Sequence, residues 1–529
     1  MATSHDLIII GAGHNGLVTA AYAARAGLKV LVLERRELVG GCAVTEELWP
    51  GFKVSTASYV NSLFRPEIIR DLELKRHGFQ MLPRSPSSFT PFPDGRYLLL
   101  GPDKEMTHRE IAKFSKNDAA SLPKYEAMLE RVADFLEPTL IETPPNPWSL
   151  KPGNLLSLAK LGLAFKKLGT DGQKAIEILT GAANPILDRW FESEEVKATL
   201  ATDAIIGAFA TPSMPGTAYV LFHHVMGECD GVRGVWGYVR GGMGGLSNAI
   251  ASAAKEKGAE IKVNTPVARI LVKEGRTQGV ALADGTEYRA AKVASGVDAN
   301  VTFLRLLDAR ELPADFVESV RHLDYASASC KINLALREVP DFSCLRGNTA
   351  GPQHRGTIHL CPTREYVERA YDPAKYGYIS ERPVIEATIP SSLDDSVAPK
   401  GQHVMSMFTQ YFPYKLAADA GTLEENKKRY AERCIDIMTE YAPNFRKAVI
   451  DYQVLAPADL EARFGLTGGN IMQGTMSLSS LSFMRPVPGY ADYRTPIKGL
   501  YLCGAATHPG GGVMGACGYN AAREILRDR

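Results

Sequence analysis

A glycine-rich segment near the start of the chain has the residue types and spacing of a phosphate-binding turn. Residues 11–16 read GAGHNG, which matches GxGxxG and directly follows the apolar run 7–10. The first glycine permits a tight turn, the second lets backbone N–H groups approach a pyrophosphate, and the third lets the next helix pack closely. The N-terminus of that helix favours phosphate charge. We therefore predict that a dinucleotide contacts Gly11, Ala12, Gly13, Asn15 and Gly16.

A carboxylate follows this turn at the expected distance. Residues 29–33 form a second apolar run that predicts a strand, and Glu34 ends it. A carboxylate about twenty residues beyond the glycines can bind the 2′-OH of a ribose. It argues against a 2′-phosphate, although Arg35 and Arg36 follow it. Strand, turn, helix and acid occur in order, which favours a dinucleotide-binding βαβ unit over an ordinary turn, with Glu34 and Arg35 at the cofactor.

Two further glycine-rich segments favour FAD over NAD. The pair Gly40 and Gly41 would let the chain pass a cofactor that extends beyond its adenosine, although a plain loop explains the pair equally well. Residues 499–504 predict a strand, and too few residues follow the turn after it for a second nucleotide-binding unit. That turn should bring a helix N-terminus, which stabilises negative charge on a reduced flavin; the alternative is a loop at a domain edge. The cofactor residues predicted in the turn are Gly504, Ala505, Gly512, Val513 and Met514.

Composition excludes several classes of protein. The 529 residues suffice for two or more domains, and 60 basic against 59 acidic residues give a net charge of +1, which argues against a nucleic-acid binder. The eight cysteines include no CxxC pair, so we predict neither a zinc site nor any other metal site. No signal-like segment and no run of 18 apolar residues is visible. We therefore expect a cytoplasmic protein, either soluble or peripherally attached to a membrane.

Taken together, these motifs resemble the phytoene desaturase-type flavoproteins. The resemblance rests on the segments already described and on residues 240–246, RGGMGGL. Residues 222–228 and 236–238 are similar to a closer branch, that of pyridine nucleotide-disulfide oxidoreductase domain-containing protein 2. The resemblance implies an α/β fold with a discontinuous, glutathione reductase-type Rossmann-like FAD-binding domain and an inserted α+β substrate domain. It also implies that the backbone of Val267 contacts the adenine.

The resemblance also implies how the chain is divided. Three stretches would form the FAD-binding domain, and two inserted stretches would form the substrate domain. The FAD-binding stretches are 1–85, 235–304 and 456–529, and the substrate stretches are 86–234 and 305–455.

The expected reaction is hydride transfer from a substrate C–H bond to N5 of the flavin. The resemblance implies dehydrogenation or desaturation of an apolar, isoprenoid or lipid-like substrate, with oxygen or a quinone as electron acceptor. His508, His223 and His224 are the candidates for proton handling. Disulfide reduction is rejected because no cysteine pair is available. An amine oxidase, a redox-neutral isomerase that uses reduced FAD, and a flavin-bound regulatory protein remain alternatives.

One apolar segment lies outside the cofactor motifs. Residues 155–168 are rich in leucine and are surrounded by lysines. Such a helix can lie in a membrane interface and take up an apolar substrate. We favour a surface helix or a self-association surface, so that a homo-oligomer is also expected.

Overall fold

The glycine-rich turn lies at the end of a strand in the first of two seven-stranded sheets. The computed structural model describes residues 5–347 and 349–528. The strand order is β11-β2-β1-β14-β13-β12, and β20 also pairs with β14. Pairing is parallel between β11, β2, β1, β14 and β20, whereas β12, β13 and β14 are antiparallel. The strands are β1 (His5–Ile10), β2 (Val30–Leu33), β11 (Glu260–Lys262), β12 (Val267–Lys273), β13 (Arg276–Leu282), β14 (Glu287–Ser295) and β20 (Leu500–Leu502).

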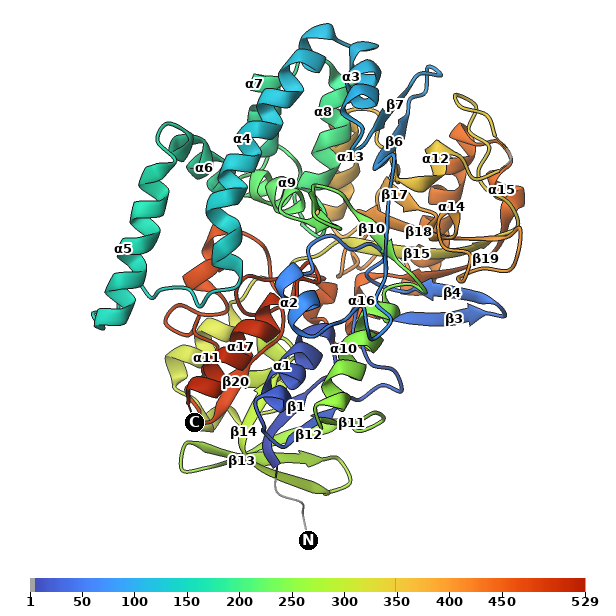
Figure 1. Cartoon of the computed structure of the whole chain (residues 1–529). Coiled ribbons are helices and arrows are strands. Elements are labelled where there is room, and N and C mark those ends of the chain that lie inside the picture. The colour runs from blue at the N-terminus through green and yellow to red at the C-terminus, as the bar shows by residue number, and fades with distance from the viewer. Residues whose placement is uncertain (1–4, 348, 529) are drawn as a thin grey trace.

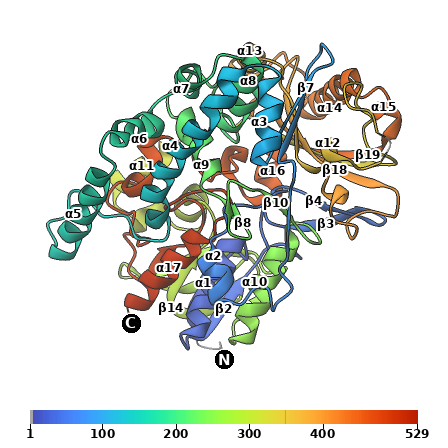
Figure 2. The same cartoon turned by 45° about the horizontal axis from the view of Figure 1, so that its top comes forward.

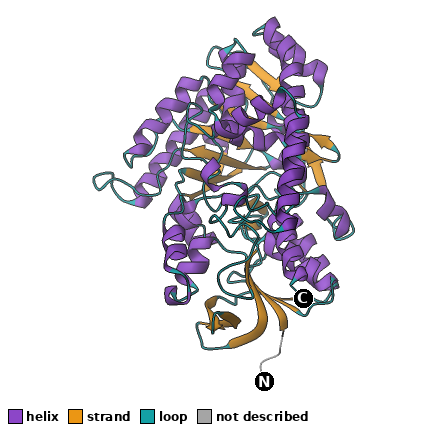
Figure 3. Cartoon of the chain, turned by 90° about the vertical axis from the view of Figure 1, so that its left-hand side faces the viewer, coloured by secondary structure: helices purple, strands orange, loops and turns teal. Residues whose placement is uncertain are grey.

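This sheet is buried on both faces, which explains the continuous apolar run of β1. Leu7 and Ile9 pack into a core shared with three helices, α1 (His14–Arg25), α10 (Gly244–Glu256) and α17 (Ala516–Arg527). Ile8 and Ile10 point to the opposite face and pack with β12–β14 and α11 (Ala314–Arg321). In Figure 3 these strands lie at the end of the molecule that carries the N-terminus.

The second sheet lies farther from the termini (Figure 1). Its strand order is β19-β15-β18-β17-β16-β6-β7. One face packs on α14 (Leu423–Tyr441) through an apolar core that includes Ile332, Ile385 and Met407. The other face is polar in its middle strands. The strands are β6 (Ser88–Pro91), β7 (Tyr97–Leu100), β15 (Ser329–Leu336), β16 (Thr357–Leu360), β17 (Val384–Thr388), β18 (His403–Gln410) and β19 (Val449–Leu455).

A helical layer stands beside the second sheet (Figure 2). Its helices share a core that also takes in Met514 from the C-terminal turn. Among them, α5 lies at the edge of the molecule in both Figures 1 and 2, and none of its residues is fully buried. The helices are α3 (Lys104–Ala112), α4 (Lys116–Leu140), α5 (Pro152–Lys167), α6 (Asp171–Thr180), α7 (Ala183–Trp190), α8 (Glu194–Ala201), the 3₁₀ turn η1 (Thr202–Ala204) and α9 (Thr217–Val225).

The remaining elements connect these layers. The strand β5 lies in the segment that leads from the first sheet to the second, and β10 lies in the segment that leads back to the first sheet. These two strands pair with each other. The connecting elements are α2 (Pro66–Asp71), α12 (Pro352–Arg355), α13 (Arg364–Lys375), α15 (Phe445–Ala448), α16 (Pro457–Phe464), β3 (Thr45–Trp49), β4 (Phe52–Ser55), β5 (Met81–Pro83), β8 (Glu228–Cys229), β9 (Val232–Arg233) and β10 (Gly237–Val239).

The predicted fold class is confirmed: the protein is mixed α/β, and its first sheet is the Rossmann-like sheet that the turn required. Strands from residues 1–85, 235–304 and 456–529 meet in that sheet. The exact domain boundaries remain a prediction. Within the described residues, no helix has the length and apolar character needed to cross a membrane.

Candidate active site

A cavity of about 1070 Å³ extends from the end of β1 to the polar face of the second sheet. Its volume is at the upper end of the range for small-molecule sites, roughly 300–1,000 Å³. The fifteen predicted cofactor residues fall into two groups, and eleven of them line the cavity. Those that line the cavity are Gly11, Gly13, Asn15, Gly16, Glu34, Arg35, Gly41, Val267, Ala505, Gly512 and Val513.

The other four do not line the cavity, but each is next in sequence to a residue that does: Ala12, Gly40, Gly504 and Met514.

The glycine-rich turn leaves the space that a pyrophosphate needs. A Cβ atom on Gly13 would meet nothing within 4 Å, because this position opens into the cavity. A Cβ atom on Gly16 would lie 2.3 Å from the carbonyl oxygen of Gly11, so no side chain fits there. Glu34 accepts hydrogen bonds from the backbone N–H of Ala12 at 2.8 Å and of Arg36 at 2.9 Å. These contacts hold the carboxylate at the end of β1, beside the turn.

The C-terminal turn and helix complete the same end of the cavity. The hydroxyl of Thr19 on α1 donates to the carbonyl of Gly518 on α17 at 3.0 Å. Gly512 has φ +111°, and a Cβ atom there would lie 2.9 Å from Cε1 of His223. The N-terminus of α17 therefore lies against the N-terminal unit. The open space at Gly13 and the converging backbone fit a bound FAD.

The structure places His508 away from the cavity lining. Its Nε2–H donates to the carbonyl of Thr139 at 2.8 Å, and burial lowers the pKa of His508 to about 4. A neutral imidazole held by a backbone carbonyl is typical of a structural residue. This position favours a structural role for His508 over the predicted catalytic one.

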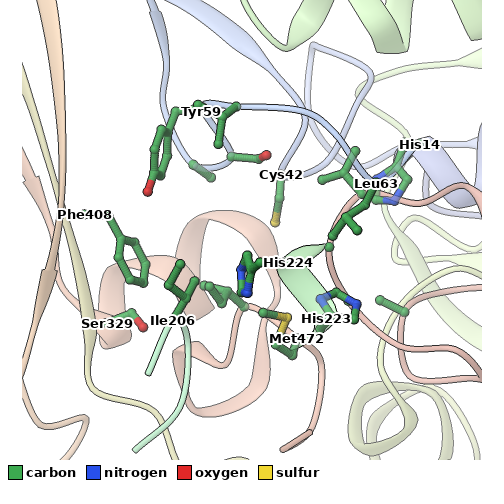
Figure 4. Close-up of a pocket in the computed structure, with 18 of the residues that line it drawn as sticks. His14, Cys42, Tyr59, Leu63, Ile206, His223, His224, Ser329, Phe408 and Met472 are labelled. Carbon is green, nitrogen blue, oxygen red and sulfur yellow. The ribbon is translucent and has the colours of Figure 1, made fainter. Parts of the chain in front are cut away.

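His223 and His224 on α9 both line the cavity (Figure 4). Burial, and secondly the neighbouring His224, lower the pKa of His223 to about 3, and its Nε2 has no hydrogen-bond partner. The Nδ1–H of His224 donates to the carbonyl of Val220 at 2.7 Å, and its ring stacks on Trp236 with centroids 5.5 Å apart. With Nδ1 as donor, Nε2 of a neutral His224 is left as an acceptor.

The sequence analysis missed a row of side chains across the second sheet. Directly opposite one another on adjacent strands lie His359 and Glu386, then Glu386 and Phe408, then Phe408 and Lys331. All four line the cavity. The available signal was a charged residue inside an apolar strand, such as the lysine of SCKINLAL at 329–336. Alternation along a strand places such a residue on one face.

Lys331 is the most unusual member of this row. It is 3% exposed, and its Nζ donates to Oγ of Ser406 at 2.8 Å and to the carbonyl of Ser55 at 3.2 Å. Burial lowers the pKa of Lys331 to about 7. An amine with this pKa can accept or donate a proton near neutral pH.

Thiol and metal chemistry find no support in the described residues. All eight cysteines are free, and burial raises the pKa of Cys42, which lines the cavity, to about 12. A thiol of this pKa is protonated at neutral pH and is a poor nucleophile. No group of three or more metal-ligating side chains occurs in residues 5–347 and 349–528.

Comparison with known proteins supports a flavin site. Residues 16–413 match the family model described as flavin containing amine oxidoreductase. The chain is 47% identical to pyridine nucleotide-disulfide oxidoreductase domain-containing protein 2 of Rattus norvegicus, over 99% of this chain and 94% of the relative. It is 24% identical to the lycopene-forming phytoene desaturase of a Paracoccus species, over 97% and 95%. Cyclohexylamine oxidase of Brevibacterium oxydans has the same fold, with a TM-score of 0.58 at 16% identity over 99% of both chains. The resemblance to the closer branch is therefore confirmed, whereas the phytoene desaturases are distant relatives.

Proposed function

The chain belongs to the flavin-containing amine oxidoreductase family and is an FAD-dependent oxidoreductase, and we propose that it dehydrogenates or desaturates an apolar, isoprenoid or lipid-like substrate. The observation that carries this proposal is the continuity of the cavity. One space joins the glycine-rich turn to apolar side chains from several distant segments. These side chains are Val60, Leu63, Ile206, Phe408, Ile471 and Met472.

The chain contributes binding and orientation to this reaction. Bound FAD supplies an acceptor for the hydride at N5 of the flavin. The glycine-rich turn and Glu34 hold the dinucleotide, and the apolar lining orients the substrate and displaces water. Lys331 can hold or release a proton at Nζ, and His224 can accept one at Nε2. Oxygen or a quinone is the proposed electron acceptor.

Oxidation of an amine is the second candidate, because the cavity contains an aromatic pair. Tyr59 and Phe408 both line the cavity, and their ring centroids are 6.3 Å apart at an interplanar angle of 31°. Figure 4 shows the two rings on the same side of the space. Aromatic faces attract cationic amines. The family description supports this candidate as well.

The test is reduction of the bound flavin by candidate substrates. The purified protein should show bands near roughly 370 and 450 nm, where oxidised flavin absorbs. Farnesene, farnesol and cyclohexylamine would then be added without oxygen. Bleaching by an isoprenoid supports the proposal, whereas bleaching by the amine alone supports amine oxidation. A flavin that none of them reduces would favour the redox-neutral isomerase or the regulatory protein.

A further inference from the structure

A buried carboxylate at the far end of the cavity lacks a hydrogen-bond partner. Glu386 is 5% exposed and lines the cavity, yet Oε1 accepts no hydrogen bond. The nearest polar side chain is that of His359, whose Nδ1 lies 3.5 Å from that oxygen and 3.0 Å from Oγ1 of Thr202. A buried carboxylate that stays unpaired is costly. A ligand in the cavity can supply a hydrogen bond to this oxygen.

A buried arginine lies at the same end. Arg84 is 3% exposed and lines the cavity. Its Nη1 donates to Oγ1 of Thr357 at 2.8 Å and its Nε donates to the carbonyl of Trp236 at 3.3 Å. Thr357 lies two positions before His359 on β16, so the guanidinium is anchored near Glu386. The guanidinium also lies over the ring of Tyr238, 5.5 Å from its centroid, and within residues 5–347 and 349–528 Arg84 forms no ion pair.

These two groups restrict the chemistry of a ligand. A hydrocarbon would leave Oε1 of Glu386 without a hydrogen bond and would offer no acceptor to Arg84. A carboxylate head would meet the negative charge of Glu386, and an ammonium head would meet the positive charge of Arg84. A neutral hydroxyl can donate to Glu386 and accept from Arg84 at once.

Other titratable groups surround Arg84 and Glu386. Asp203, His224, Tyr59 and Lys331 also face this part of the cavity. Burial raises the pKa of Asp203 and raises that of Tyr59 well above its usual value, which favours the neutral form of both. Burial lowers the pKa of Lys331 to about 7, which also favours its neutral form.

We propose that the ligand of this cavity is an amphipathic alcohol, whose apolar body occupies the apolar part and whose hydroxyl binds between Arg84 and Glu386. This inference deepens the proposed function and rests on it in taking the cavity as the substrate site. It narrows the substrate class from an apolar compound to one with a hydroxyl head.

The test compares ligands that differ only in the head. Equilibrium dialysis of the FAD-loaded protein would measure Kd for labelled 1-octanol and for 1-methoxyheptane, which lacks only the donor. We expect 1-octanol to bind at least about tenfold more tightly, the effect of a hydrogen bond to a charged group. Glu386→Met should abolish this preference, and the same change at the exposed Glu381 should leave it intact.

Several results would overturn the inference. These are equal affinity for the two ligands in the unmodified protein, a preference that survives in Glu386→Met, or tighter binding of octylamine or octanoate. The ligand comparison in the unmodified protein decides the matter even where the variant does not fold. Equilibrium dialysis measures binding alone, so the result does not depend on whether the protein oxidises the ligand. A preference for octanol without flavin reduction by any candidate would contradict the proposed function alone, and reduction by farnesene without such a preference would contradict this inference alone.

Discussion

The backbone N–H of Ala12 donates a hydrogen bond to Oε2 of Glu34 at 2.8 Å, which ties the end of β1 to the end of β2. The two residues are neighbours because β1 and β2 pair in parallel, with Ile10 opposite Leu33. We predict that this carboxylate binds a ribose hydroxyl of the cofactor.

Glu34→Ala should weaken FAD binding. The variant loses the acceptor for a ribose hydroxyl and leaves the N–H of Ala12 unpaired, for a cost of about 1.5–3 kcal/mol. Titration of the apoprotein with FAD, followed by flavin fluorescence, would measure the change in Kd. The exposed Glu37→Ala is the control. An unchanged Kd in Glu34→Ala would mean that this carboxylate does not bind the cofactor.

Gly13→Val should prevent FAD binding without unfolding the protein. The added side chain enters open space in the cavity, which the pyrophosphate would otherwise occupy. We expect a normal circular dichroism spectrum and almost no flavin after purification. Gly162→Ala on α5, where a Cβ atom also meets nothing within 4 Å, should keep its flavin. Full flavin content in Gly13→Val would place the cofactor elsewhere.

The pKa of Lys331 makes stability depend on pH. Its pKa is about 7 in the folded protein and 10.5 in the unfolded chain, so between these values only the unfolded state binds the proton. Stability should therefore rise with pH, by up to about 1.4 kcal/mol per unit. Urea unfolding at pH 7, 8 and 9 would show a smaller slope in Lys331→Met than in the unmodified protein. The exposed Lys160→Met is the control, and identical slopes in all three proteins would contradict the prediction.

His508→Ala should reduce stability and spare the flavin. The carbonyl of Thr139 loses its donor, which lowers the free energy of unfolding by about 1–3 kcal/mol. The Kd for FAD should stay the same because His508 does not line the cavity. Denaturant unfolding and FAD titration would be compared with those of the exposed His322→Ala. If the variant instead kept its free energy of unfolding and its Kd for FAD changed, His508 would belong to the flavin site.

Vesicle binding would decide whether the outward leucines of α5 contact a lipid surface or another copy of the chain. Leu155, Leu156 and Leu163 are 46%, 58% and 62% exposed, whereas Phe165 packs against Phe135 on α4. No acidic residue occurs between 148 and 168, and lysines surround the leucines. Co-sedimentation with vesicles that contain phosphatidylserine should be lost when the three leucines become serine. Gel filtration is the control: a dimer that these changes dissociate, without vesicle binding, would identify a self-association surface instead.

The cofactor unit could be predicted because its determinants are local. The turn at 11–16, the strand before it and Glu34 lie within one short stretch, and each residue type has a direct physical reason. The C-terminal turn was predictable for a similar reason, since its glycines at 510, 512 and 515 lie between a strand and a helix that are adjacent in the sequence. The sequence by itself therefore determined the cofactor and the class of fold.

Only the tertiary structure decided what surrounds the rest of the cavity. His359, Glu386, Phe408 and Lys331 form one row because four strands, drawn from residues 329–410, pair in a particular register. Register depends on pairing between distant segments and on the packing of the opposite face against α14, which no local pattern encodes. The direction of His508 depends likewise on where Thr139, at the end of α4, comes to lie. A histidine in a glycine-rich turn can face either side of that turn, and long-range packing selects the side.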